Sequence, residues 1–155
     1  MGTVPRCESV RWRLWYEELE EALEGAKRSA EVTHNHIEGI KGAQATTMAI
    51  FLARFSVDKP EPKKQIEERI GYNLDETVDS IRTWYHFDVS CQGTVPQAIT
   101  CFLESESYEE TIRKTASLGG DRDTLACIAG GIAEAYYGVP DKHHQGGILI
   151  APRGY

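Results

Sequence analysis

The stretch that decides the fold is EGIKGAQATTMAIFLARF, residues 38–55. Its apolar side chains fall on more than one face at helical spacing, which predicts a helix that is buried on most sides. Its alanines and glycines allow the backbones of neighbouring helices to approach closely. A buried helix needs packing partners, and the flanking sequence is expected to supply them as further helices.

Two helices are predicted beside this stretch. Residues 14–32 space apolar side chains at three and four, with acidic residues between them, as on an amphipathic helix. On the other side, Pro60 and Pro62 interrupt the pattern, and a short exposed helix over residues 63–70 is expected to end at Gly71.

The second half of the chain predicts helices as well. Residues 74–85 carry Asp75 as a candidate cap, and the next helix is expected to open at Val95 and Pro96, because proline is tolerated in a first turn. Ser107 followed by Glu110 predicts a capping box. A last, alanine-rich helix follows residue 124. No segment shows convincing period-two alternation, so the predicted fold class is all-α.

Composition narrows the class of protein. At 155 residues the chain suits one domain, and 41% hydrophobic and 26% charged residues are ordinary for a globular protein. A net charge of −7 argues against nucleic-acid binding. No secretory signal or bilayer-length apolar run is present, and the four cysteines form no CxxC pair. We therefore expect a cytoplasmic protein with no membrane partner.

The motif GGDRDT, residues 119–124, allows two interpretations. Gly119 and Gly120 bring backbone N–H groups close to a ligand, while Asp121, Asp123 and Thr124 offer hard oxygen atoms suited to Mg²⁺ or Mn²⁺. Alternatively, a glycine ends one helix and an aspartate caps the next. Spacing alone favours the caps, because Asp is common at helix N-termini.

The histidines and cysteines give weaker signals. His34 and His36 are two residues apart, which suits a loop better than one face of a helix. A zinc site would need further ligands, and His143, His144 and the cysteines lack the spacing of known zinc sites. Cys91 has no nominated base, so packing is its expected role.

Three stretches together resemble one family. Residues 29–54 (SAEVTHNHIEGIKGAQATTMAIFLAR), 90–105 (SCQGTVPQAITCFLES) and 116–140 (ASLGGDRDTLACIAGGIAEAYYGVP) are similar, in that order, to the C-terminal half of ADP-ribosylglycohydrolases of the dinitrogenase-reductase-activating type. The resemblance implies a compact orthogonal bundle of helices. It also implies a hydrolase that removes ADP-ribose from modified protein side chains with two Mg²⁺ or Mn²⁺ ions.

The resemblance assigns roles to particular residues. It implies that Asp121, Asp123 and Thr124 are metal ligands, that Gly119 and Gly120 approach the substrate, and that His34 lies beside bound ADP-ribose. The preference for helix caps at GGDRDT is thereby reversed. Arg122 stands where the family usually has a small or polar residue, and it is a competitor of the metal for a carboxylate. The implied partner is ADP-ribose or an ADP-ribosylated protein.

The chain also departs from the family. Family members are about twice as long, and their first half carries a Thr-Asp-Asp-Thr motif with the remaining metal ligands. We therefore expect residues 14–140 to form an incomplete domain that needs a separately encoded N-terminal half. The alternative is a non-catalytic remnant or binding module. Either way, apolar surface over residues 40–55 is expected to stay uncovered.

The two ends, residues 1–13 and 141–155, lack family-like sequence. When codons for residues 1–13 are regrouped as the last base of each with the first two of the next, they can be read as GNGSAMRVSPVA. That string resembles the glycine-rich family segment that precedes the first motif. A frameshift before about residue 14 is therefore expected.

Overall fold

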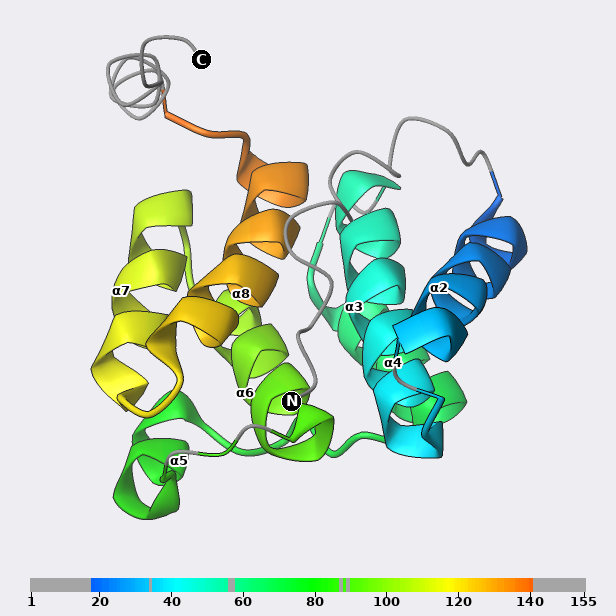
Figure 1. Ribbon diagram of the computed structural model, residues 1–155. Coiled ribbons are helices and arrows are strands. Elements are labelled where there is room, and N and C mark those ends of the chain that lie inside the picture. The colour runs from blue at the N-terminus through cyan, green and yellow to red at the C-terminus, as the bar shows by residue number, and fades with distance from the viewer. Residues whose placement is uncertain (1–17, 34, 56–57, 87, 89, 141–155) are drawn as a thin grey trace, which may run out of the picture.

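The structure of the protein is a computed structural model that describes residues 18–33, 35–55, 58–86, 88 and 90–140. Over these residues it consists of α-helices and contains no strand, which confirms the all-α prediction (Figure 1). The helices are α2 (Leu19–Thr33), α3 (Ile37–Phe55), α4 (Pro60–Ile70), α5 (Val78–Trp84), α6 (Cys91–Leu103), α7 (Tyr108–Leu118) and α8 (Arg122–Tyr137). No helix in the described ranges is long and apolar enough to cross a bilayer.

Helix α3 is the central element, as its sequence predicts. It packs against α2, α4, α6 and α8. Nine of its nineteen residues are buried, and most of these are small, so several neighbours approach it closely. The expected apolar surface over residues 40–55 is therefore largely absent. Within the described part of α3, large exposed apolar side chains remain at its two ends, Ile37 and Phe55.

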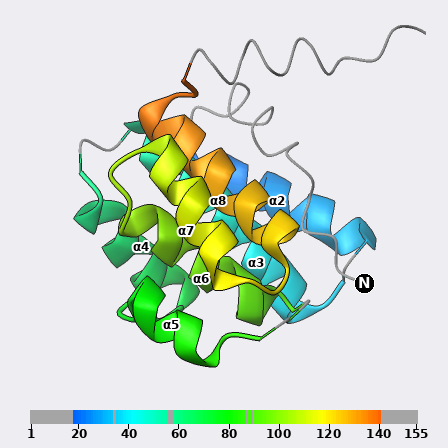
Figure 2. The same cartoon turned by 90° about the vertical axis from the view of Figure 1, so that its left-hand side faces the viewer.

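A second layer is formed by α6, α7 and α8. Figure 2 shows α8 lying along α7 and across α6, and these pairs are in direct contact. Ile99, Phe102 and Ile132 are completely or almost completely buried between these helices and α3. Removing each such side chain from water contributes about 1.5–3 kcal/mol, so the core and not helix propensity holds the bundle together.

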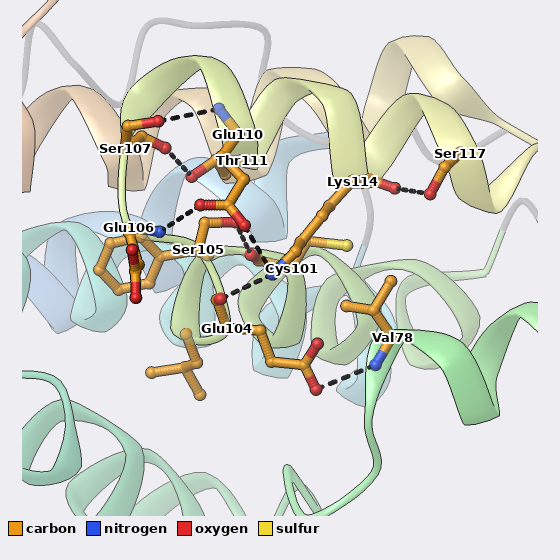
Figure 3. Close-up of polar contacts among 12 residues, drawn as sticks. Val78, Cys101, Glu104, Ser105, Glu106, Ser107, Glu110, Thr111, Lys114 and Ser117 are labelled. Carbon is orange, nitrogen blue, oxygen red and sulfur yellow. Dashed lines mark hydrogen bonds and ion pairs between the residues drawn. The ribbon is translucent and has the colours of Figure 1, made fainter.

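The α6–α7 corner is held by polar contacts (Figure 3). Ser107 caps α7 as predicted, since its hydroxyl accepts a hydrogen bond of 3.2 Å from the Glu110 backbone N–H. The Glu110 carboxylate accepts from the backbone N–H of Glu106 (2.7 Å), one residue before the position that a capping box requires. Glu104 accepts from the Lys114 ammonium with its carbonyl and from the Val78 backbone N–H with its carboxylate.

Two predicted helix starts in the middle of the chain are wrong. Helix α4 begins at Pro60, because a first helical turn has no need of the N–H that proline lacks. Its end at Gly71 (φ 78°) is as predicted. Helix α5 is capped by Thr77, whose hydroxyl accepts from the Ser80 N–H. Asp75 forms an ion pair of 2.6 Å with Lys63 instead.

The predicted start of α6 is also wrong. The helix begins at Cys91, with Ser90 as its N-cap, and Pro96 lies inside it. The Ser90 hydroxyl accepts from the Gly93 N–H at 3.1 Å, and the Asp88 carboxylate accepts from the Ser90 N–H at 2.7 Å. This pair of caps starts the helix before the proline.

Candidate functional site

The GGDRDT motif forms the turn between α7 and α8. Gly119 ends α7 with φ 77° and ψ −149°, and Gly120 follows with φ 57°. Side chains rarely adopt such positive φ values, and the conformation at Gly119 is essentially restricted to glycine. Open space surrounds Gly119, so its conformation and not crowding requires a glycine.

Asp121 caps α8. Its carboxylate accepts a hydrogen bond from the Thr124 backbone N–H (3.4 Å) and a shorter one from the Thr124 hydroxyl (2.6 Å). The capping interpretation of the sequence is thus what the geometry shows. Capping leaves the ligand interpretation open, because a carboxylate has further lone pairs and the Thr124 hydroxyl oxygen keeps its own while its O–H donates to Asp121.

The two residues after Asp121 lie in a more open environment than Asp121 itself. Arg122 and Asp123 are exposed on the first turn of α8. Within the described ranges, Arg122 forms no ion pair with either aspartate of the motif, so the expected competition with a metal has no counterpart here. Asp123 thus presents an exposed carboxylate next to the half-buried Asp121 and Thr124.

One neighbour of Asp121, Tyr85, has no signal in the sequence. Burial raises the pKa of the Tyr85 hydroxyl, and the carboxylates of Asp121 and Asp88 raise it further. The side chain of Asp88 lies against Gly93, where an added Cβ would be 1.9 Å from Asp88 Oδ2. The segment between α5 and α6 therefore places Tyr85 near Asp121, and Asp88 at the start of α6. Only the tertiary fold places these residues together.

The first turns of three helices face the same side of the molecule. The N-terminal ends of α3, α6 and α8 all lie in the lower part of Figure 1 and towards the right of Figure 2. Helix N-termini carry partial positive charge, which favours an anionic ligand, whereas the carboxylates of Glu38, Asp121 and Asp123 in these first turns act against it.

The histidine motif lies just before α3. His34 is outside the described residues. His36 is exposed and lies in the non-helical segment that the spacing predicts, where its Nδ1 accepts from the Glu38 backbone N–H at 3.3 Å. His36 is thus an N-terminal cap for α3.

Cys91 is a packing residue, as expected. It is half-buried at the start of α6, and a Cβ added to Gly42 of α3 would lie 2.8 Å from the Cys91 Cβ. Burial raises the pKa of the Cys91 thiol, and the Glu38 carboxylate adds to the effect. The thiol therefore stays protonated near neutral pH. Beside it, Glu38 Oε2 and the Tyr72 hydroxyl are buried without a hydrogen-bond partner in the described part of the chain.

The metal-ligand interpretation fits the donor chemistry of the motif but not the number of donors. Two carboxylates and a hydroxyl on one helical turn are hard oxygen donors of the kind that Mg²⁺ and Mn²⁺ prefer. In the segments that the structure describes, however, no three His, Cys, Asp or Glu side chains gather into a group suited to a metal. The motif by itself has too few donors for a complete coordination shell.

Comparison with known proteins identifies the family to which the chain is similar. A sequence model of ADP-ribosylglycohydrolases matches residues 2–141. The ADP-ribosylhydrolase ARH3 of Mus musculus is 27% identical, and the alignment covers 85% of this chain and 49% of that protein. For ARH3 of Homo sapiens the identity is 28%, with 80% and 39% covered. An uncharacterised protein of Archaeoglobus fulgidus is 25% identical, with 78% and 45% covered.

This chain therefore spans half or less of the length of these relatives. The family match nevertheless extends over nearly all of the chain and includes the histidine motif, the start of α6 and the GGDRDT turn. The chain belongs to the ADP-ribosylglycohydrolase family.

Proposed function

We propose that the chain supplies one part of a hydrolase site that removes ADP-ribose from modified protein side chains. The observation that carries the proposal is the GGDRDT turn at the start of α8 in a chain that belongs to this family. The partner is then ADP-ribose or an ADP-ribosylated protein. The proposed domain covers residues 14–140, as the sequence resemblance suggests.

The proposed role of the motif is to hold divalent ions. Asp121, Asp123 and Thr124 are the proposed ligands, and Mg²⁺ or Mn²⁺, two ions in the complete site, would activate water and stabilise charge at the anomeric carbon. Asp121 fixes the direction of the Thr124 hydroxyl proton, so that the lone pairs of Thr124 Oγ1 stay available. Gly119 and Gly120 leave the backbone at this turn without side chains, which supports close approach of a substrate.

The positive ends of three helices support an ADP-ribose ligand. The diphosphate of ADP-ribose is anionic, and the N-termini of α3, α6 and α8 face one side (Figure 1). His34 directly precedes the segment that leads into α3, which is compatible with its proposed place beside the ligand.

A second candidate is a non-catalytic module that binds ADP-ribose or metal weakly. It is favoured by the incomplete set of ligand groups in the described residues, because a few carboxylates leave Mg²⁺ mostly hydrated. Under the first candidate the remaining ligands come from a separate N-terminal half. The two candidates share their metal ligands and differ in turnover once that half is added.

The metal role is tested by Mn²⁺ binding, followed by electron paramagnetic resonance of the free ion. We expect Asp121→Asn/Asp123→Asn to weaken Mn²⁺ binding by about tenfold or more, since losing even groups outside the first ligand sphere costs 10–100-fold in affinity at metal sites. Asp79→Asn is the matched control, because Asp79 is an exposed carboxylate in the first turn of another helix, α5. Equal affinity of both variants would refute the ligand role.

A further inference from the structure

A groove with basic and apolar walls lies between α2, α3 and α4, which are neighbours in the right-hand part of Figure 1. It has a volume of about 510 Å³, within the range of about 300–1,000 Å³ that is usual for ligand clefts. Lys27, Lys41 and Arg69 line it together with Ile37, Ile40 and Ile70. None of the described residues that line this groove is acidic.

The groove is basic, although the chain as a whole is acidic. Acidic residues outnumber basic ones by 24 to 17, yet three cations from three helices meet here. Arg69 is paired with Glu20 at 2.5 Å, and Lys27 approaches Glu31 only to 4.0 Å. Lys41 lies 5.0 Å from the centre of the Tyr72 ring, and no described carboxylate comes within 4.0 Å of its ammonium. The cations are therefore only partly neutralised.

The apolar part of the groove is open to solvent. Ile37 is 75% exposed, and Ile40 and Ile70 are partly buried. Isoleucines from two helices thus form one apolar strip with cations along its sides. Exposed apolar surface that is surrounded by polar groups is typical of a protein-binding site.

A second, acidic groove adjoins the first at one end. It shares Arg69 and Ile70 with the first groove, but its other walls include Glu20 and Glu24. An anionic partner is therefore attracted to the end near Ile37 and repelled at the end near Glu24. The groove near Ile37 therefore favours an acidic segment, and the acidic walls near Glu24 limit how far along the surface that segment can extend.

We propose that this groove binds a helical segment of a partner protein. One face of that segment carries leucine-like side chains at i, i+3 and i+4, and acidic side chains lie beside them. The apolar strip would take the leucines, and Lys27, Lys41 and Arg69 would face the carboxylates. This is the helix-in-groove mode, in which anchors at i, i+3 and i+4 enter an apolar channel. The strip spans α3 and α4 and the cations come from three helices, which suits a helical segment of several turns better than one small anion. The inference goes beyond the proposed function, because it needs neither ADP-ribose nor metal.

The test is fluorescence anisotropy with a labelled peptide of about 14 residues, long enough to form a helix on binding. The peptide carries Glu and Leu at helical spacing, and a second peptide has Lys in place of Glu. We expect the full chain to bind the acidic peptide at least tenfold more tightly. Since the net charge of −7 attracts the basic peptide to the rest of the surface, this preference must come from the groove.

Two variants locate the binding. Lys27→Gln/Lys41→Gln is expected to weaken binding of the acidic peptide about tenfold, because two charge pairs at the protein surface are lost. Ile37→Gln is expected to weaken it several-fold. The controls are Lys64→Gln and Val32→Gln, an exposed cation and an exposed apolar residue that do not line the groove. Both controls should bind like the unchanged protein.

Methyl spectra identify the surface independently. In protein labelled at the isoleucine methyls, the acidic peptide should shift the signals of Ile37, Ile40 and Ile70 and leave that of Ile132 in the core unchanged. No binding of the acidic peptide at about 1 mM, which corresponds to about −4 kcal/mol, overturns the proposal. Equal binding of both peptides, or of Lys27→Gln/Lys41→Gln and Lys64→Gln, overturns it as well.

Discussion

At the scale of single residues, Asp121 and Asp123 differ in what they do for stability. Asp121 accepts two hydrogen bonds at the start of α8, so Asp121→Ala is expected to lower the free energy of unfolding by about 1 kcal/mol. Asp123 caps nothing, and Asp123→Ala should change it by at most about 0.5 kcal/mol. Urea unfolding measures both values. Equal losses of unfolding free energy in the two variants would show that the capping hydrogen bonds of Asp121 add no stability beyond what Asp123 contributes.

Cys101 makes stability depend on alkaline pH. Burial raises the pKa of its thiol from 9.0 to about 12. A pKa that is higher in the folded state means that stability is fully present below pH 9 and is lost as the pH rises towards 12. The expected loss is about 1 kcal/mol per pH unit above pH 9.

Urea unfolding at several pH values between 9 and 11 measures this loss. Cys101→Ala is expected to flatten the dependence but not abolish it, because burial also raises the pKa of Tyr137 to about 12. If the unfolding free energy falls equally steeply with pH in Cys101→Ala and in the unchanged protein, Cys101 is not the source of this pH dependence.

The candidate site could be predicted only where its contacts are local. Asp121 and Thr124 are three residues apart, so their hydrogen bond follows from helix capping and is readable from the sequence. Tyr85, in the segment between α5 and α6, lies close enough to Asp121 for that carboxylate to raise the pKa of its hydroxyl. No spacing rule connects Tyr85 to residue 121, because the packing of α5 and α8 on their shared neighbours α6 and α7 brings the two together.

At the scale of elements, two of the three wrong helix starts concern prolines. Pro60 is expected to lie before a helix and is instead the first residue of α4, whereas Pro96 is expected in a first turn and lies inside α6. Ser90 caps α6 and Asp88 accepts from the Ser90 N–H, so that the helix begins ahead of Pro96. The types of the helices were predictable from periodicity, whereas their boundaries depended on hydrogen bonds that periodicity does not reveal.

The contact between α3 and α6 is close enough to test with one methyl group. A Cβ at position 42 would lie 2.8 Å from Cys91 Cβ and 3.1 Å from its sulfur, so Gly42→Ala forces the first turn of α6 away from α3. We expect a loss of about 1–3 kcal/mol in the free energy of unfolding, as for other overpacked cores. Thermal unfolding followed by circular dichroism measures it.

Helix propensity acts in the opposite direction at this position. Alanine in place of glycine within a helix would otherwise stabilise the protein by up to about 1 kcal/mol. A Gly42→Ala variant that is more stable than the unchanged chain would therefore show that α3 and α6 can move apart without cost.

At the scale of the whole molecule, α3 is better covered than its sequence alone indicates. Four helices pack on it, and the described core is continuous from Leu23 on α2 to Ala133 on α8. The sequence predicts a buried helix correctly, but it does not show how many of the partners lie within these 155 residues. A compact core of this kind is compatible with folding of the chain by itself, even though it spans half or less of its relatives.

Folding alone is not expected to give catalysis. Because the proposed metal ligands of the GGDRDT motif are too few to hold Mg²⁺ by themselves in the described residues, the isolated chain should release no ADP-ribose from ADP-ribosylarginine in the presence of Mg²⁺. Chromatographic detection of free ADP-ribose, with and without a chelator, measures this. Metal-dependent turnover that Asp121→Ala abolishes would show that the chain is complete. Turnover that Asp121→Ala leaves intact would have to come from a contaminating enzyme, which makes this variant the decisive control.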